Sequence, residues 1–231
     1  MKNSGKFIAV IPARSGSKSI KDKNIKKING KPLIAYSIIQ CFKSKVFDKI
    51  YVSTDSIKYA KIARKYGPVE IIYRPKNISK DLSSDFQMIE HVMKKINKNY
   101  EFIAHMRPTS PQRSINEIKL ATKQLKNSSF SSLRSVHEMS ESSYKSVEIK
   151  NGRIITLKNL KLGIEAINKP RQKFPKTYSP NGVIDIYRKK VILEENKLYG
   201  EKVKAFITQF SQEIDSVNDF KYLQYLWRKK K

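Results

Sequence analysis

The hydrophobic pattern alternates between short apolar runs and longer stretches in which apolar residues recur every three or four positions. The short runs are rich in β-branched residues, which is typical of buried strands, and the longer stretches are typical of amphipathic helices. The pattern predicts strands, in chain order, at 7–11, 50–52, 69–73, 102–106, 132–136, 183–187 and 203–210. It predicts five helices. The first starts at Pro32, the second passes through Ala60 and Ala63, and the third starts within 81–85 with Ser84 as a cap. The fourth spans 114–125, and the fifth passes through Phe220, Leu223 and Trp227.

Strands that alternate with helices predict an α/β fold: a Rossmann-like three-layer sandwich with a mostly parallel sheet. The 231 residues suit a single domain, 1–231, with a substantial core. Between about 139 and 180 the pattern changes, because two short apolar segments flank an Asn151-Gly152 turn and a stretch rich in Lys and Pro follows. We interpret 139–180 as a small inserted arm rather than a second domain.

The first predicted strand leads directly into a loop of small and cationic residues, 11–24. Arg14, Lys18 and Lys23 provide positive charge, and Gly16 lies among several Ser residues. Small residues let backbone N–H groups approach an anion, and the cations neutralise it. A strand that feeds such a loop at the start of an α/β chain is a typical place for a nucleotide triphosphate. The alternative is a solvated basic turn; we favour phosphate binding because all these features occur together.

Two common phosphate loops are excluded by spacing. Lys18 follows Ser17 rather than the Gly of a Walker A loop, and the single Gly16 cannot supply the three Gly residues of a dinucleotide fingerprint. Sugar-1-phosphate nucleotidyltransferases are a nearer alternative, but their first loops are usually Gly-rich and end in Lys-Pro.

The loop resembles the signature of the CMP-sialic acid synthetases, the acylneuraminate cytidylyltransferases. The match is Ile-Pro-Ala-Arg-x-Gly-Ser-Lys-x-Ile-x-x-Lys-Asn at 11–24, then Asn-Gly-Lys-Pro-Leu at 29–33. Val-Ser-Thr-Asp at 52–55 and Pro-Thr-Ser-Pro-x-Arg at 108–113 also resemble the family. The resemblance covers nearly the whole chain and implies transfer of CMP from CTP to a nine-carbon 2-keto sugar acid. Related enzymes activate legionaminic, pseudaminic and 3-deoxy-octulosonic acids, which stay open as alternatives.

The resemblance also implies site residues and a homodimer. The catalytic cations on the triphosphate are Arg14, Lys18 and Lys23. The nucleotide-binding residues are Ala13, Arg14, Ser17, Asn24, Arg74 and Ser84. The sugar-binding residues are Arg107, Thr109, Ser110, Lys145 and Arg171, of which the last two lie in the arm that reaches the partner's site. Two residues have open alternatives: Arg74 as a surface side chain, and Asp55 as a helix cap or a ligand contact.

Arg107 departs from the family pattern, which usually has Gln before the Pro-Thr-Ser-Pro motif, near the sugar acid. An Arg can pair with a carboxylate through two parallel hydrogen bonds. We therefore expect Arg107 to affect which sugar acid is bound.

Two acidic residues precede the last predicted helix. Glu213 and Asp215 are two positions apart, so they point the same way in an extended chain. Mg²⁺ (or Mn²⁺) prefers such hard oxygen ligands together with phosphates and water. The family has Asp-Ile-Asp here, so Glu213 is longer by one methylene. The alternative is a pair of exposed acids, with Ser216 or Asp215 as helix cap; the two preceding motifs make us favour the metal.

Composition supplies a hypothesis of a different class. The formal net charge of +28 is compatible with nucleic-acid binding, but the Lys residues are spread along the whole chain, whereas a dedicated binder usually clusters its charge. A nucleic-acid partner is therefore not favoured. The single Cys excludes a disulfide framework, and no apolar run approaches the ~20 residues of a membrane span. Residues 7–11 are too short for a signal-peptide core, so we expect the cytoplasm.

Overall fold

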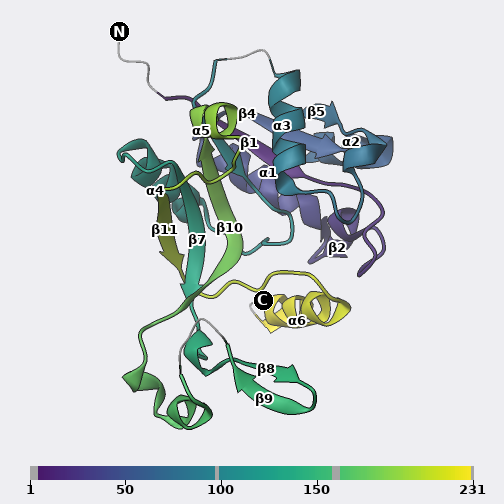
Figure 1. Ribbon diagram of the computed structural model, residues 1–231. Helices are drawn as coiled ribbons and strands as arrows, with labels where there is room; N and C mark the ends of the chain where they lie inside the picture. The colour runs from purple at the N-terminus through teal and green to yellow at the C-terminus, as the bar shows by residue number, and fades with distance from the viewer. Residues whose placement is uncertain (1–4, 97–98, 158–161, 230–231) are drawn as a thin grey trace.

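The computed structural model describes residues 5–96, 99–157 and 162–229. They form a seven-stranded sheet with helices on both faces, and an arm that projects from one end (Figure 1). The strands of the sheet are β1 (Phe7–Pro12), β4 (Phe47–Thr54), β5 (Glu70–Tyr73), β6 (Phe102–His105), β7 (Ser132–Glu138), β10 (Tyr178–Arg188) and β11 (Val203–Thr208). Their order is β11-β7-β10-β6-β1-β4-β5. Only β10 runs antiparallel to its neighbours, so the prediction of a mostly parallel α/β sheet is confirmed.

The helices lie close to the predicted positions. They are α1 (Leu33–Ser44), α2 (Ile57–Ala63), α3 (Asp85–Lys95), α4 (Ile115–Lys126), α5 (Lys189–Glu195) and α6 (Val217–Lys229). Ser84 and Ser114 cap α3 and α4, each accepting a hydrogen bond from the backbone N–H three residues on and completing a capping box. Pro32 is not the first residue of α1: it is extended, precedes the helix, and pairs in the small hairpin of β2 (Lys27–Ile28) and β3 (Lys31–Pro32).

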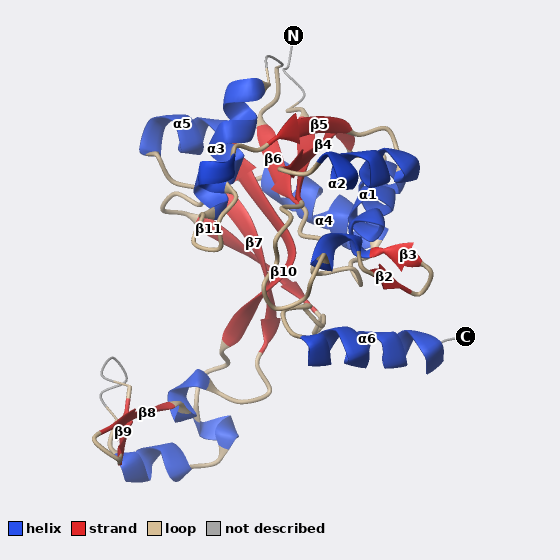
Figure 2. Cartoon of the chain, turned by 90° about the vertical axis from the view of Figure 1, so that its right-hand side faces the viewer, coloured by secondary structure: helices blue, strands red, loops and turns tan. Residues whose placement is uncertain are grey.

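The two faces of β1 show how the strand sequence builds the layers. Ala9 and Ile11 pack with residues of α1, α2 and α4 on one face, and Ile8 and Val10 pack with residues of α3 and α5 on the other. Figure 2 shows these two groups of helices on opposite sides of the sheet. Because both faces are covered, the strand is apolar throughout instead of alternating with polar residues.

The polarity of the strands decides where the loops meet. The carboxyl ends of parallel β1, β4, β5 and β6 lie at one edge of the sheet, which is where open α/β sheets bind ligands. The antiparallel β10 begins at this same edge, because Asp185 pairs with His105 at the end of β6. The edge therefore collects four loops and the first half of β10.

The arm leaves the sheet between β7 and β10 (Figure 1). Its hairpin of β8 (Val147–Lys150) and β9 (Arg153–Thr156) turns at Asn151 and Gly152, which both have positive φ, as the Asn-Gly pair predicts. The far boundary differs from the expected 180: β10 already begins at Tyr178 and pairs through Pro180 with Val136.

Candidate active site

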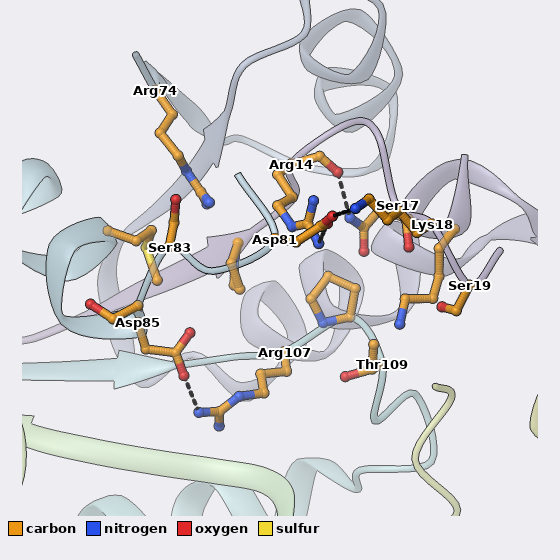
Figure 3. A pocket seen from close by; sticks show the side chains of 16 residues that line it. Arg14, Ser17, Lys18, Ser19, Arg74, Asp81, Ser83, Asp85, Arg107 and Thr109 are labelled. Carbon is orange, nitrogen blue, oxygen red and sulfur yellow. Dashed lines mark hydrogen bonds and ion pairs between the residues drawn. The ribbon is translucent and has the colours of Figure 1, made fainter. Parts of the chain in front are cut away.

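A polar cleft of about 400 Å³ lies at the carboxyl edge of the sheet, between the loops that follow β1, β5 and β6 (Figure 3). This volume is in the usual range for small-molecule sites. The residues that line it are Pro12, Arg14, Ser17, Lys18, Ser19, Lys23, Asn24, Arg74, Asp81, Ser83, Ser84, Asp85, Met88, Arg107, Pro108 and Thr109.

The first loop is held in place by polar contacts to its neighbours. The Asp55 carboxylate accepts hydrogen bonds from both the backbone N–H and the hydroxyl of Ser15, each at 2.7 Å. The Asn24 amide donates to the Arg14 carbonyl oxygen at 3.0 Å. Asp55 is therefore not the helix cap, since Ser56 caps α2; its described contacts fix the loop instead.

Two of the predicted phosphate cations share one carboxylate. Arg14 and Lys18 each lie 2.8 Å from the carboxylate of Asp81, which comes from the loop before α3 (Figure 3). The hydrogen bonds from Lys18 and Arg14 lower the pKa of Asp81, so this carboxylate is ionised at neutral pH. The Asp81 carboxylate thus pairs with Arg14 and Lys18, two of the cations that are predicted to bind the triphosphate.

Arg74 is buried, so the alternative of a surface side chain is wrong. Only 8% of it is exposed, and its guanidinium donates to the hydroxyl and carbonyl oxygens of Ser53. Burial lowers its pKa to about 10, which leaves it charged at neutral pH. Arg74 therefore adds a fixed positive charge to the side of the cleft formed by β4 and β5.

The segment before helix α6 places the two predicted metal ligands against Thr109 and Lys23, which line the cleft. The apolar side of α6 packs with Ile28 and Leu33, and this cluster also buries Ile214. The Ile214 N–H donates to the Thr109 carbonyl oxygen at 3.0 Å, and the Ile214 carbonyl oxygen accepts from Lys23 Nζ at 3.0 Å. The backbone of residue 214 is thus fixed between the first loop and the loop after β6.

Glu213 and Asp215 flank that fixed residue and contact different partners. Glu213 Oε1 accepts from the Thr109 hydroxyl at 3.0 Å, and Asp215 Oδ1 lies 3.3 Å from Lys23 Nζ. A Cβ at Gly182, which has φ +61°, would lie 2.8 Å from Glu213 Oε1, so this position favours glycine. The helix cap is Ser216, which pairs reciprocally with Asp219, so Asp215 has no capping role.

The side chain of Arg113 holds the loop after β6 in place. This buried side chain donates to the carbonyl oxygens of Val183 and Arg107 and to the hydroxyl of Ser37. Ser110 is also fully buried and donates to the Asn181 carbonyl oxygen. Thr109 lines the cleft, whereas Ser110 lies behind it and supports the turn at residues 181–182.

Arg107 reaches the cleft, but its guanidinium is already paired. It donates to Asp185 at 2.6 Å and to Asp85 at 2.8 Å. Two carboxylates of the protein therefore already pair with Arg107, so a carboxylate of the sugar acid would share the guanidinium with them.

Three other predicted residues lie away from the cleft surface. Ala13 is buried, and its N–H donates to the Ser53 carbonyl oxygen. Lys145 and Arg171 lie in the arm, where they donate to the carbonyl oxygens of Lys169 and Ser140. Within one chain these two cations do not line the cleft that Arg14, Lys18 and Lys23 share.

Sequence reasoning assigned no site role to three acidic residues that pair with the cations of the cleft. Asp81 pairs with Arg14 and Lys18, and Asp85 and Asp185 pair with Arg107. Met88 also lines the cleft. Asp81 and Asp85 follow the strand β5 at the carboxyl edge, a position that could have indicated them. Asp185 had no such signal, because it lies within an apolar strand pattern.

A polar cleft with several cations at the carboxyl edge of the sheet is typical of α/β proteins that bind phosphorylated ligands. A family model described as "Cytidylyltransferase" matches residues 8–231, and the chain belongs to this family.

Several relatives have similar sequences. The chain is 34% identical over 228 residues to an N-acylneuraminate cytidylyltransferase of Escherichia coli O18:K1:H7, covering 97% of this chain and 53% of that protein, so it spans about half of that relative's length. It is 31% identical to a CMP-N,N'-diacetyllegionaminic acid synthase of Campylobacter jejuni, covering 95% of this chain and 94% of that protein. It is 29% identical to a "Post-translational flagellin modification protein B" of Campylobacter coli, covering 97% of this chain and 96% of that protein.

A solved structure supports the fold. A CMP:2-keto-3-deoxy-manno-octonic acid synthetase complexed with CTP superposes with a TM-score of 0.74 at 16% identity, covering 98% of this chain and 100% of that one.

In the described parts of the present chain, every helix is too short or too polar to cross a membrane.

Proposed function

We propose that the protein transfers CMP from CTP to a nonulosonic acid of the sialic type and releases pyrophosphate, supplying a CMP-sugar for surface glycan synthesis. The observation that carries this proposal is the convergence of Arg14, Lys18 and Lys23 on one cleft of a cytidylyltransferase fold, with Asp215 3.3 Å from Lys23. The names of the sialic and legionaminic relatives support the sugar class. N-Acylneuraminic acid is our first candidate, and legionaminic, pseudaminic and 3-deoxy-octulosonic acids are the alternatives.

In this reaction the anomeric hydroxyl of the sugar acid attacks the α-phosphorus of CTP. A bond forms between that oxygen and phosphorus, the bond to the β-phosphate breaks, and the hydroxyl proton is released. Such chemistry depends on positioning and charge neutralisation more than on covalent help from the protein. Arg14 and Lys18 would bind the triphosphate, and Lys23, fixed by the Ile214 carbonyl oxygen, would stay directed at it.

Glu213 and Asp215 are the residues that would hold Mg²⁺ or Mn²⁺. The described residues contain no group of three or more His, Cys, Asp or Glu side chains placed for a metal ion. Two carboxylates nevertheless suit Mg²⁺ when phosphates and water complete its ligands. When bound, the metal would neutralise charge on the phosphate oxygens.

Pyrophosphate release in the presence of CTP and a panel of sugar acids tests this function. We expect release with CTP and at least one nonulosonic acid, and little with ATP, GTP or UTP. Absence of release with every acid, together with tight and steeply salt-dependent binding to DNA or RNA, would instead support the nucleic-acid hypothesis.

Asp81→Asn tests whether the triphosphate replaces the Asp81 carboxylate on Arg14 and Lys18. A neutral amide competes less for these cations, so we expect the KM for CTP to fall. Both pairs are exposed to solvent and therefore weak, so we expect a change of only about two- to fivefold. Asp48→Asn, an exposed acid near the start of β4, is the control. A higher KM for CTP would mean that Asp81 supports nucleotide binding.

We also predict a homodimer formed through the arm. Ile149 and Ile154 lie opposite each other on the hairpin and are 79% and 60% exposed, an apolar pair that a partner subunit could cover. Sedimentation at micromolar concentration should show a dimer, and Ile149→Asp with Ile154→Asp should shift it toward monomer. Leu193→Asp, an exposed position on α5, should not. A fully active wild type that sediments only as monomer would contradict this prediction.

A further inference from the structure

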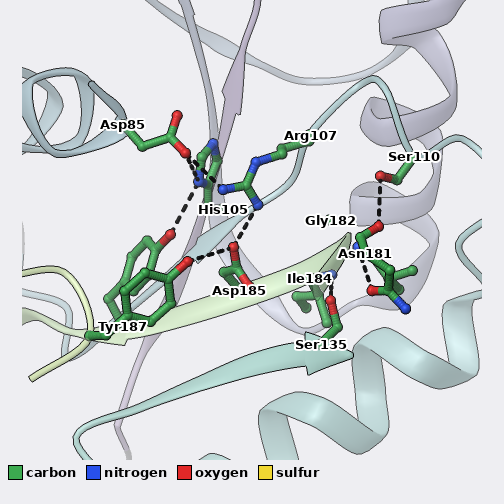
Figure 4. Close-up of polar contacts among 12 residues, drawn as sticks. Asp85, His105, Arg107, Ser110, Ser135, Asn181, Gly182, Ile184, Asp185 and Tyr187 are labelled. Atoms are coloured by element: carbon green, nitrogen blue, oxygen red, sulfur yellow. Dashed lines mark hydrogen bonds and ion pairs between the residues drawn. The ribbon is translucent and has the colours of Figure 1, made fainter. Parts of the chain in front are cut away.

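A charged cluster lies at the β6 end of the cleft, and we call Asp85, Arg107 and Asp185 the Arg107 cluster (Figure 4). Arg107 uses one terminal nitrogen for Asp185 and the other for Asp85. The Tyr199 hydroxyl donates to the same oxygen of Asp185 at 3.0 Å. The three residues come from the start of α3, the end of β6 and the middle of β10, so the fold holds them together.

Burial separates the roles of the two carboxylates. The Asp185 side chain is 2% exposed, whereas that of Asp85 is 48% exposed and lines the cleft. His105 lies beside them, with Nδ1 3.9 Å from Asp85 and 3.2 Å from the Tyr187 hydroxyl. Burial lowers the pKa of His105 to about 3, so it brings no positive charge to the cluster at neutral pH. The Asp85 carboxylate is therefore the most exposed group of the Arg107 cluster and the one most accessible to a ligand.

We propose that Asp85 is a specificity-determining acceptor, which receives a hydrogen bond from a hydroxyl or N–H group of the sugar acid. Arg107 and Asp185 are positioning residues that fix the orientation of Asp85. This inference rests on the proposed function. It follows from the placement of the carboxylate, because Asp85 lines the cleft and is 48% exposed, and Arg107 holds its Oδ2, which leaves Oδ1 for a donor of the ligand.

The cluster also explains how this chain accommodates Arg107. Burying a guanidinium or a carboxylate alone is strongly unfavourable, and removing one partner of a buried pair leaves the other charge without compensation. Arg107 and Asp185 thus depend on each other. A Gln at 107, the usual residue in the family signature, would leave Asp185 buried without its cation.

Asp85→Asn is the first test. An amide turns its oxygen toward Arg107 and its NH₂ toward the cleft, where it meets the donor of the substrate. Losing a hydrogen bond to a charged group should raise the KM for the sugar acid about ten- to hundredfold, with the KM for CTP within about twofold. Glu90→Gln, an outward acid paired with Lys94 on the same helix, is the matched control. A change confined to the KM for CTP, or no change, would overturn the acceptor role.

Sugar specificity provides a second readout of the same variant. The wild type should discriminate between a good sugar acid and its deoxy or N-deacylated analogues at one ring position. Asp85→Asn should reduce that ratio of kcat/KM toward one. If the ratio is the same in both proteins for every position examined, Asp85 does not select the sugar.

Arg107→Gln and the double variant Arg107→Gln/Asp185→Asn separate positioning from direct binding. The single variant should melt earlier and have a higher KM for the sugar acid, and the added Asp185→Asn should recover the melting temperature and most of the KM. If Arg107 binds the sugar carboxylate directly, the double variant stays as impaired in KM as the single. A wild type inactive with every sugar acid would refute the proposed function; an active wild type with unchanged variants would refute this inference alone.

Discussion

Lys23→Ala should lower kcat/KM for CMP transfer by about 10²–10³-fold, the usual effect of removing one preorganised charge from a phosphoryl-transfer site. Lys23 is placed for this role by two contacts, to the Ile214 carbonyl oxygen at 3.0 Å and to Asp215 at 3.3 Å. Its side chain is 13% exposed, so it is directed into the cleft rather than free in solvent. Unlike Arg14 and Lys18, it has no described contact with Asp81.

The same substitution should leave the fold intact. The first loop keeps the bonds from Ser15 to Asp55 and from Asn24 to Arg14, and α6 keeps its apolar packing. Thermal melting should therefore change little while activity is lost. Lys21→Ala is the matched control, because Lys21 is an exposed cation two residues away that does not line the cleft. Near-normal kinetics of Lys23→Ala would remove the first loop from the active site.

The strands of the parallel core could be predicted because both of their faces are buried. A run such as residues 7–11 is apolar at every position, and this signal is independent of distant contacts. The first half of β10 was missed for the opposite reason. Pro180, Asn181 and Gly182 are turn-forming residues, and the pairing with β7 shifts register between Pro180 and Asp185. Pairing with β7 places that segment in the sheet despite its turn-forming residues.

The cations of the cleft could be predicted and their partners could not. Arg14, Lys18 and Lys23 lie within ten residues of one another, so their joint purpose is visible in one loop. The acids that pair with them come from other loops: Asp81 is 67 residues from Arg14, and Asp185 is 78 residues from Arg107. Such contacts arise from the order of the strands. The resemblance therefore showed that Arg107 replaces a Gln of the family, but it could not show that Arg107 pairs with Asp85 and Asp185.

Asp215→Asn should reduce activity far more than Glu213→Gln. Asp215 is 73% exposed and contacts only Lys23 among its described side-chain partners, so its carboxylate is available to a metal ion. Ser216 caps α6, so the amide should not destabilise the helix. Glu213 already accepts from Thr109 and sits against Gly182, and a Gln oxygen can keep that hydrogen bond.

The size of the Asp215→Asn effect should be about 10²–10³ in rate, because a neutral amide keeps the shape but loses the charge that would hold Mg²⁺ beside the triphosphate. If the defect is mainly in metal affinity, it should shrink as Mg²⁺ is raised, whereas Glu213→Gln should show a smaller dependence. The measurement is the initial rate of pyrophosphate release across a Mg²⁺ titration for wild type and both variants. Wild-type activity and wild-type Mg²⁺ dependence in Asp215→Asn would show that this carboxylate only pairs with Lys23, and the proposed metal site would then be wrong.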